Sequence, residues 1–356
     1  MQFRRFAAAA AAALVSGTVV AACSSGGSAS SGGTAGGGSA AAKPTIVVAA
    51  PECAHCLAMA LLSKEMPGYN VKFQSFSTLT ALTAGLASGA IDVGQIDYTG
   101  LVSFIDKDLP VVAISGEVNG GSDFVLAPSD KLPADDWTAF KALVAKDKAA
   151  GNPLKIASQF GTVQDIELRL ELPKYGIDPD TDVDMVNVPY QGMAQALHNG
   201  SVQAAIPVQP FAAAITNGGF GVHFAYPYDQ AAGDLTNVVV VSKSFLAQHP
   251  SEVAAIAKGM TDLVPYLKTP AGQAAWAAAI EQYTGTSAAD VKTAMAQLTP
   301  AIDMPFTQIE AISSAMFAQK LITTDLSKST LLQHVDYAPL ATASGVSQDA
   351  VGATGS

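Results

Sequence analysis

The sequence predicts an α/β protein in which mainly parallel sheets are covered by helices. Short apolar runs typical of strands alternate with helical stretches, and this alternation favours parallel sheets. In the first half, the predicted strands are 45–50, 70–73 and 91–95, and the predicted helices are 56–65 and 78–88. The second helix is predicted to end at Gly89, because glycine commonly follows a helix C-terminus.

The same order of elements returns in the second half of the chain. The predicted elements are a strand at 155–157, a turn at Gly161, a helix at 163–174, a strand at 183–188, a helix at 192–198 and a strand at 202–206. Aligned without a gap, the halves pair Leu86 with Leu197, Gly89 with Gly200, Ile91 with Val202 and Val93 with Ala204. This match predicts two similar lobes, although convergent helix-to-strand turns would produce the same short pattern.

Helical segments dominate the sequence after residue 250. Two of them are predicted to begin with capping boxes, in which a hydroxyl and an acidic side chain three residues later satisfy free N–H groups. The pairs are Ser287 with Asp290 and Thr307 with Glu310. We expect these helices to form a C-terminal cover and the residues after Gly345 to be a loose tail.

The N-terminal residues have the parts of an export signal. Two arginines precede an apolar run at 6–20, which is too short to span a bilayer with any margin, and small residues precede Cys23. The tetrapeptide VAAC at 20–23 resembles the bacterial lipobox, in which the cysteine is acylated and becomes the new N-terminus. We therefore expect residues 1–22 to be a signal peptide and Cys23 to carry the lipid. An ordinary signal peptide and an N-terminal membrane helix are the alternatives.

The segment after the signal predicts a membrane tether. Residues 23–43 consist almost wholly of Ser, Gly, Ala and Thr, and such a composition cannot bury enough apolar surface to fold. No apolar run after residue 20 reaches the length of a membrane span. We expect an extracytoplasmic domain held by lipid on a bacterial cell membrane, on the periplasmic side or at the cell surface.

The charge balance narrows the expected partners. The full sequence has 19 Lys and Arg against 30 Asp and Glu, and without residues 1–22 it has 17 against 30, a net charge of −13. An acidic chain of this kind is not expected to bind nucleic acid.

Five segments, in order along the chain, resemble the solute-binding proteins of ABC importers in the nitrate, sulfonate, taurine and pyrimidine-precursor group. The resemblance covers about residues 44–340 and includes the pair Pro210-Phe211. The segments are "ALTAGLASGAIDVGQID", "DFVLAPSDKLP", "IASQFGTVQDIELRLELPKYGID", "VPYQGMAQALHNGSVQAAIPVQPFAAA" and "NVVVVSKSFLAQHP".

The resemblance implies a type II periplasmic binding protein fold, in which two α/β lobes are joined by two chain crossings and hold a solute between them. The crossings are expected near 123–127 and 221–225. The implied parts are lobe one at 44–123 with 225–270, lobe two at 124–224, C-terminal helices on lobe one at 271–345 and the tail at 346–356. The resemblance also implies a monomer without cofactors that delivers its small-molecule solute to the permease subunits of an ABC importer.

In open parallel sheets, ligands bind outside the carboxyl ends of the strands. Amides such as Gln95, Gln191 and Gln209 can both donate and accept there without adding charge. The aromatic candidates are expected either as cavity walls or as core, and Thr162 either as a helix cap or as a contact. The candidate ligand-binding residues are Glu52, Phe76, Ser77, Thr78, Gln95, Asp97, Tyr98, Glu117, Ser122, Gln159, Gly161, Thr162, Tyr190, Gln191, Gln209 and Phe211.

The charged residues help to predict the charge of the solute. Arg169 is the only arginine after residue 5 and lies about two turns into its predicted helix, so no guanidinium clamp on an anion is expected. Glu52, Asp97 and Glu117 suit an amine or a neutral polar group better, if they face inward. We expect a small organic solute, either sulfonate-like or taurine-like, or aromatic and pyrimidine-like.

The motif Cys53-Ala54-His55-Cys56 follows the first predicted strand. Outside the cytoplasm, two nearby cysteines are expected to form a disulfide, although reduced thiols, a redox pair and a metal site remain open. A thiol-disulfide redox lipoprotein using Cys53 and Cys56 is therefore one alternative function, and a solute sensor without transport is another. No G-x-S-x-G, Walker A, H-E-x-x-H or cysteine-dense iron motif is present, so we do not expect an enzyme.

Overall fold

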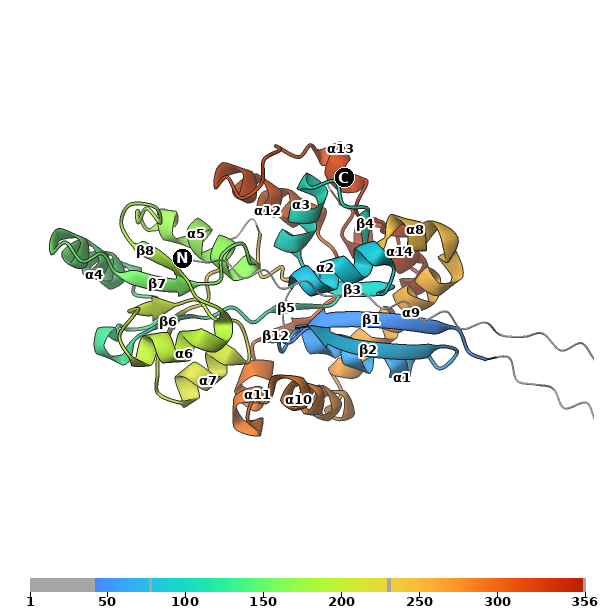
Figure 1. Ribbon diagram of the computed structural model, residues 1–356, viewed down its shortest axis with the longest axis horizontal. Helices are drawn as coiled ribbons and strands as arrows, with labels where there is room; N and C mark the ends of the chain where they lie inside the picture. Colours follow the sequence, from blue (N-terminus) through green and yellow to red (C-terminus); the bar gives the residue numbers. More distant parts are fainter. Residues whose placement is uncertain (1–41, 77–78, 229–231, 355–356) are drawn as a thin grey trace, which may run out of the picture. The chain divides into compact units, whose positions relative to one another are not determined.

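The computed structural model describes residues 42–76, 79–228 and 232–354 (Figure 1). Residues Lys43–Ser356 form one unit by their contacts. The predicted signal peptide, the lipidation site Cys23 and nearly all of the predicted tether lie outside the described residues. Within the described part, no helix is both long and apolar enough to cross a membrane.

A five-stranded sheet forms the first lobe. In sheet order its strands are β2 (Asn70–Phe76), β1 (Thr45–Pro51), β3 (Val93–Asp97), β11 (Asn237–Ser242) and β4 (Val111–Gly116). β1 pairs in parallel with both β2 and β3. β11 runs antiparallel to β3 and β4, because this strand returns to the sheet from the second lobe.

A second five-stranded sheet forms the second lobe. In sheet order its strands are β10 (Val222–Ala225), β6 (Phe124–Leu126), β9 (Ala204–Ala205), β7 (Lys155–Ser158) and β8 (Asp184–Asn187). β7 pairs in parallel with β8 and β9. The strands that enter and leave this lobe, β6 and β10, pair with each other in antiparallel fashion.

The chain passes between the lobes twice. The first sheet uses residues 45–116 and 237–242, and the second uses residues 124–225. The first passage carries β5 (Val118–Gly120), which pairs with β12 (Leu298–Pro300). The expected crossings at 123–127 and 221–225 are instead occupied by β6 and β10. The passages lie just before and just after these two strands, because both strands already belong to the second sheet.

Helices cover both faces of the first sheet. β11 illustrates the arrangement, since Val238 and Val240 enter one core and Val239 and Val241 enter the other. One face is covered by α2 (Leu79–Ser88) and α3 (Tyr98–Asp106). The other is covered by η1 (Cys56–Leu61), α1 (Leu62–Glu65) and α9 (Pro250–Leu267). The short α8 (Lys243–Gln248) precedes α9.

The second sheet is also covered on both faces. The turn η2 (Pro128–Asp130) leads to α4 (Trp137–Ala149), and α4 packs with α5 (Val163–Lys174) on one face. This core is aromatic, and the Phe124 ring meets the Phe140 ring edge to face at 5.4 Å between centroids. On the other face lie α6 (Tyr190–His198) and α7 (Phe211–Asn217).

Each lobe contains the same helix-to-strand turn. Gly89 after α2 and Gly200 after α6 have φ angles of 73° and 72°, a region that glycine enters without strain. The Ile91 N–H donates to Gly85 O at 3.1 Å, and the Val202 N–H donates to Ala196 O at 3.3 Å. The gap-free alignment of the two halves therefore pairs residues that are equivalent in the structure.

The C-terminal helices pack on the first lobe and also contact the second. They are α10 (Pro270–Thr284), α11 (Ala288–Met295), α12 (Phe306–Ala318), α13 (Lys328–Leu332) and α14 (Ala338–Ser344). Because α11 contacts α7 and α12 contacts α5, the cover is not confined to lobe one.

One of the two predicted capping boxes is present in its hydroxyl half, and the Asp290 carboxylate accepts from the Ser287 hydroxyl at 2.7 Å instead of from its N–H. The Asp290 N–H donates to Ser287 Oγ at 3.3 Å at the start of α11. The prediction for Thr307 and Glu310 is wrong, because α12 already begins at Phe306 after Pro305 and has no side-chain cap. Thr307 therefore lies inside the first turn rather than before it.

The expected loose tail is wrong for residues 346–354. A short turn of helix, η3 (Asp349–Val351), buries Val351 to 3% exposure. The Met304 N–H donates to Val351 O and the Phe306 N–H donates to Gly352 O, both at 2.9 Å. Gly352 has a φ of 112°, and a Cβ there would lie 2.4 Å from the Met304 carbonyl. A glycine is thus needed for the tail to dock this closely.

Candidate functional site

Loops from both lobes line a cavity of about 410 Å³. The first lobe contributes residues that end β1 and β3 or begin β11, and the second contributes the turn after β7 and the starts of α5, α6 and α7. These loops lie outside the carboxyl ends of the strands, which is where ligand sites form in such sheets. The lining residues are Pro51, Glu52, Cys53, His55, Cys56, Gln95, Asp97, Gln159, Thr162, Val163, Gln164, Pro189, Tyr190, Gln191, Val208, Phe211 and Asn237.

Half of the predicted ligand-binding residues lie on this cavity. They are Glu52, Gln95, Asp97, Gln159, Thr162, Tyr190, Gln191 and Phe211. Gly161 belongs to the same turn as Gln159 and Thr162 without itself lining the cavity, and Ser77 and Thr78 lie outside the described residues. A contact between any of them and a solute stays a prediction.

Several other predicted residues are built into the protein interior instead. Phe76 packs against the core of the first lobe, and Tyr98 is fully buried in that core. Ser122 Oγ donates to Glu167 Oε2 at 2.7 Å. Gln209 is 2% exposed, and its Oε1 accepts from the Ala213 N–H at 3.0 Å. None of these four is a lining residue, because each side chain is directed to a partner or a core behind the loop.

Glu117 is likewise not a lining residue. It is fully buried between β4 and β5, and neither carboxylate oxygen has a partner with hydrogen-bond geometry among the described residues. Burial raises the pKa of Glu117 well above its ordinary value, against a weak opposing effect of the Met59 backbone N–H. Glu117 thus lies inside the first passage between the lobes and does not face the cavity.

Gln95 lines the cavity and has a buried, unpaired acceptor atom. Its side chain is fully buried, and Nε2 donates to Ile96 O at 3.1 Å. That bond fixes which end of the amide is the nitrogen. Gln95 Oε1 has no partner among the described residues and is itself buried, so it is an unsatisfied acceptor in the wall behind the cavity surface.

Asp97 both caps a helix and lines the cavity. Its Oδ1 accepts from the Gly100 N–H at 2.6 Å at the start of α3. Burial raises the pKa of Asp97, and hydrogen bonds with backbone N–H groups, including Gly100 and Val163, act in the opposite direction. Val163 begins α5 in the second lobe, so Asp97 faces that lobe.

The turn after β7 brings the second lobe to the cavity. Gly161 has a φ of 81°, and its N–H donates to Asp165 Oδ2 at 3.1 Å. Thr162 is the N-cap of α5 but makes no side-chain cap; its hydroxyl donates to Gln159 O at 2.8 Å. Thr99 Oγ1 donates to Gly161 O at 3.1 Å. A residue of the first lobe is thereby bonded directly to this turn.

An aromatic pair forms one wall of the cavity. The rings of Tyr190 and Phe211 are nearly parallel, at 14°, with centroids 6.3 Å apart. The Tyr190 hydroxyl donates to Gln164 Oε1 at 2.6 Å. Burial raises the pKa of Tyr190, so the hydroxyl stays protonated and the wall stays uncharged.

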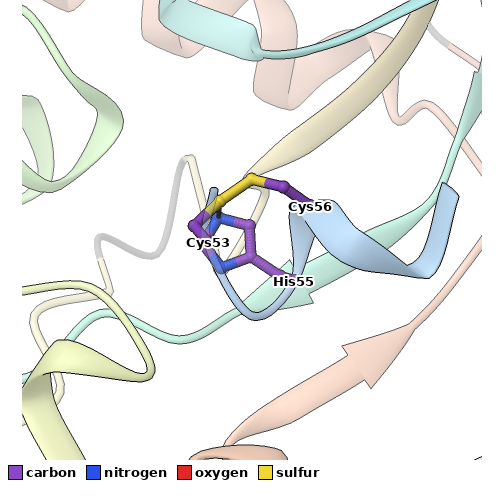
Figure 2. Close-up of side chains that lie close together, drawn as sticks. All are labelled: Cys53, His55 and Cys56. Carbon is purple, nitrogen blue, oxygen red and sulfur yellow. Dashed lines mark hydrogen bonds between the residues drawn. A yellow bond between two sulfur atoms is a disulfide. The ribbon is translucent and has the colours of Figure 1, made fainter. Parts of the chain in front are cut away.

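Cys53 and Cys56 form a disulfide next to His55 (Figure 2). Both cysteines line the first-lobe side of the cavity. His55 Nε2 lies 3.4 Å from Cys53 Sγ, and burial lowers the pKa of His55 to about 3. A neutral imidazole does not favour a thiolate, and Cys56 is only 2% exposed. These features favour a structural bond over a redox pair. The three side chains offer possible metal ligands within 4.8 Å, but bonded sulfur atoms are not thiolate ligands.

Two distant parts of the chain form hydrogen bonds with the disulfide loop, residues 53–56. The Ala54 N–H donates to Gln209 O of the second lobe at 3.0 Å. Ala54 O accepts from Trp276 Nε1 of α10 at 2.9 Å. The loop is therefore held at the junction of both lobes and the C-terminal helices.

Sequence reasoning missed several lining residues. Gln164 could have been found, because it follows Thr162 in the first turn of the same helix and also donates to Ser122 Oγ at 3.1 Å. Asn237 begins β11 and gave no comparable signal before its pairing with β3 was known. The other lining residues not among the predictions are Pro51, His55, Val163, Pro189 and Val208.

The lining residues include two carboxylates and no Lys or Arg. Glu52 Oε1 accepts from Ser75 Oγ at 3.1 Å. Arg169 is engaged elsewhere on α5, since Nε donates to Asp165 Oδ1 at 3.1 Å and Nη1 donates to Asp180 Oδ1 at 3.4 Å. The charged side chains that line the cavity are therefore acidic, in agreement with the acidic loops of the sequence.

Sequence comparison relates the chain to two binding proteins whose names state their ligands. It is 24% identical over 206 residues to the taurine-binding periplasmic protein of Escherichia coli strain K12, covering 57% of this chain and 59% of that protein. It is also 24% identical over 199 residues to the nitrate/nitrite binding protein NrtA of Synechococcus elongatus, covering 54% of this chain and 45% of that protein. The chain thus spans about half the length of these relatives.

Structural comparison agrees with the predicted fold. The structure is similar to the periplasmic nitrate-binding protein NrtA from Synechocystis PCC 6803, with a TM-score of 0.73 at 14% identity, over 88% of this chain and 92% of that one. The chain therefore has the two-lobed fold of periplasmic solute-binding proteins. A family model described as NMT1-like matches residues 40–281. Since this match covers more than half of the sequence, the chain belongs to the NMT1-like family.

Proposed function

We propose that this protein is the extracytoplasmic solute-binding component of an ABC importer. It captures a small organic solute between its lobes and delivers it to the permease subunits. The observation that carries the proposal is the cavity of about 410 Å³ lined by strand-end loops of both lobes, a volume within the range of small-molecule sites. The named relatives are binding proteins rather than enzymes, which supports binding without chemistry.

The permease would recognise the closed form of the two lobes. Gln95 and Asp97 approach the solute from the first lobe, and Thr162, Tyr190 and Gln191 approach it from the second. To move the population from mostly open to mostly closed, the solute must favour the closed form by roughly 5 kcal/mol. The Thr99 bond to Gly161 O contributes to the closed form.

The cavity test uses the mature lipoprotein purified in detergent. Isothermal titration with taurine, nitrate, an alkanesulfonate and benzene-ring fragments is expected to find at least one ligand. Tyr190→Ala is expected to lower the affinity for that ligand about tenfold or more, since burying an aromatic side chain contributes about 1.5–3 kcal/mol. Phe317→Ala is the matched control, because Phe317 is 40% exposed on α12 and does not line the cavity.

Binding that is insensitive to Tyr190→Ala would count against this site, and the absence of any ligand would count against the function. Cells that lack the protein are expected to lose uptake of the ligand found. Unchanged uptake with intact binding would instead indicate a sensor.

We further propose that Cys23 anchors the protein through its lipid. The tetrapeptide at 20–23 and the Ser/Gly-rich stretch that follows support this, since two or more acyl chains hold a protein on a membrane firmly. Cys23→Ser is expected to move the protein from the membrane fraction to the soluble extracytoplasmic fraction, measured by fractionation and immunoblot. Ser24→Ala, one residue away, is the control and should leave the protein on the membrane. A Cys23→Ser protein that stays on the membrane contradicts the anchor.

A further inference from the structure

We propose that the Cys53–Cys56 disulfide positions the walls of the solute cavity, so that reduction of this bond weakens solute binding and a bound solute opposes the reduction. The inference rests on the proposed function, because it concerns the same cavity. It gives the disulfide a role in binding through the residues that it holds, without any redox step on a substrate. Three features of the described residues support it.

The first feature is a chain of hydrogen bonds that passes through the disulfide loop. The Trp276 Nε1–H donates to Ala54 O at 2.9 Å, and the Ala54 N–H donates to Gln209 O at 3.0 Å. The Gln209 N–H in turn donates to Gly121 O at 2.9 Å. The two backbone groups of Ala54 therefore join the C-terminal helices to the second lobe, and through Gln209 to the first passage between the lobes.

The second feature is that this chain of bonds ends at the aromatic wall of the cavity. Gln209 precedes α7, and its Oε1 accepts from the Ala213 N–H in the first turn of that helix at 3.0 Å. The same turn begins with Phe211, whose ring is stacked with the ring of Tyr190 at the cavity. The two bonded cysteines line the cavity on the first-lobe side. The disulfide loop thus positions residues on both sides of a solute.

The third feature is the weakness of the other links between the two cysteine side chains. The N–H groups of Cys56 and Leu57 donate to Cys53 O at 3.1 and 3.2 Å, and these bonds hold the backbone turn but not the side chains. His55 Nε2 lies 3.4 Å from Cys53 Sγ. Burial lowers the pKa of His55 to about 3, so its neutral imidazole does not form an ion pair with a thiolate after reduction. A loop that is ordered before the solute arrives binds more tightly, because its ordering does not then oppose binding.

Reduction of the disulfide requires a dithiol, which is oxidised in the exchange. One thiolate of the dithiol attacks Cys53 Sγ, since Cys53 is half-buried while Cys56 is only 2% exposed. The S–S bond breaks, Cys56 Sγ leaves with the electron pair and takes a proton, and the second thiol of the dithiol then releases Cys53. Two electrons and two protons pass from the dithiol to the two cysteines, and the dithiol becomes a disulfide.

Solute binding and reduction are linked because the same solute meets two forms of the protein. If the solute binds the oxidised form about tenfold more tightly than the reduced form, it must stabilise the disulfide by the same factor. A tenfold factor corresponds to about 30 mV for this two-electron couple. A saturating solute is therefore expected to make the reduction potential about 30 mV more negative.

Titration calorimetry on the mature lipoprotein measures the effect on binding. The probe is whichever of taurine, nitrate, an alkanesulfonate or a benzene-ring fragment binds the oxidised protein most tightly. We expect the protein reduced with excess dithiothreitol, and the double variant Cys53→Ser with Cys56→Ser, to bind this probe about tenfold more weakly. Dithiothreitol should leave the affinity of the double variant unchanged. Wild-type affinity in the reduced protein or in a folded double variant overturns the inference.

Val144→Ala is the control for a general loss of stability. Val144 is 3% exposed in the core of the second lobe and does not line the cavity. We expect this variant to have a lower melting temperature and an unchanged affinity for the probe. A fall in affinity equal to that of the double variant would show that lost stability alone weakens binding, and would overturn the positioning role.

A redox titration of the unsubstituted protein measures the linkage and needs no variant to fold. The lipoprotein is equilibrated with mixtures of reduced and oxidised dithiothreitol, with and without saturating probe, and the reduced fraction is measured by mass spectrometry after alkylation. Cys53 and Cys56 are the cysteines counted, since the third, Cys23, is the one expected to carry the lipid. The probe is expected to shift the equilibrium about tenfold toward the disulfide. An equilibrium that the probe does not move overturns the inference.

The outcomes separate this inference from the function on which it rests. If the oxidised protein binds a panel solute in a manner sensitive to Tyr190→Ala and reduction leaves that affinity unchanged, the positioning role is wrong and the solute-binding function stands. If no panel solute binds the oxidised protein, the function falls and this inference falls with it.

Discussion

Replacing Trp276 with alanine is expected to lower the free energy of unfolding by about 3–5 kcal/mol, the usual cost of emptying a fully buried tryptophan site. Trp276 is 0% exposed and packs in the first-lobe core with Ile46, Leu57 and Ile280. Its Nε1 also donates to Ala54 O at 2.9 Å. The substitution therefore opens a cavity and leaves a carbonyl of the disulfide loop without its donor.

Urea unfolding followed by far-ultraviolet circular dichroism measures this loss without relying on tryptophan fluorescence. Trp276→Phe is the informative partner, because it keeps an aromatic ring in the core while it removes the N–H donor and leaves a smaller cavity than alanine does. We expect it to lose about 1–3 kcal/mol. Solute affinity should fall in both variants, since Cys53 and Cys56 beside Ala54 line the cavity. If Trp276→Ala lowers the free energy of unfolding by less than about 1 kcal/mol, Trp276 does not stabilise this loop.

Asp165→Ala is expected to lower the free energy of unfolding by about 3–5 kcal/mol, because it removes the buried carboxylate that several donors share, and only Arg169 keeps a second acidic partner, the exposed Asp180. The Asp165 side chain is 1% exposed and that of Arg169 is 14% exposed. Besides Arg169 Nε, the carboxylate accepts from Ser158 Oγ at 2.8 Å and from the Gly161 N–H at 3.1 Å. Three donors at the end of β7 thus depend on one side chain.

The same urea titration measures the effect of Asp165→Ala. Asp165→Asn keeps one acceptor oxygen and the side-chain volume, so its loss should be clearly smaller. Asp182→Ala is a control, because the Asp182 pair with Lys148 is much more exposed and such surface pairs contribute about 0–1 kcal/mol. If Asp165→Ala and Asp182→Ala cost the same, the buried network does not hold the Gly161 turn.

Local patterns in the sequence were sufficient to predict most elements of the fold. The helix at 163–174 has the predicted bounds, and Gly89 and Gly200 mark equivalent turns, because a positive φ after a helix is a strong and local requirement. The docked tail was not predictable in this way. The Met304 N–H donates to Val351 O, and no periodic sequence pattern predicts a backbone contact of that kind.

The location of the candidate site followed from topology, but its composition did not. The rule for strand ends placed Gln95, Asp97 and Tyr190 at the cavity, since the backbone order alone determines which loops converge. Ser122 and Gln209 lie in loops of the same kind and turn away from the cavity. The direction of a loop side chain depends on partners such as Glu167, which belong to another part of the chain.

The bond between Trp276 and Ala54 joins residues 222 positions apart, and this separation affects how the protein is made. Residues 53–56 of the disulfide loop are synthesised early. Trp276, whose indole donates to this loop, is synthesised only after more than two hundred further residues. Contacts of such long range form late in folding, because the intervening chain must first be ordered. The disulfide loop at the cavity therefore reaches its final, hydrogen-bonded form only after the last third of the chain is present.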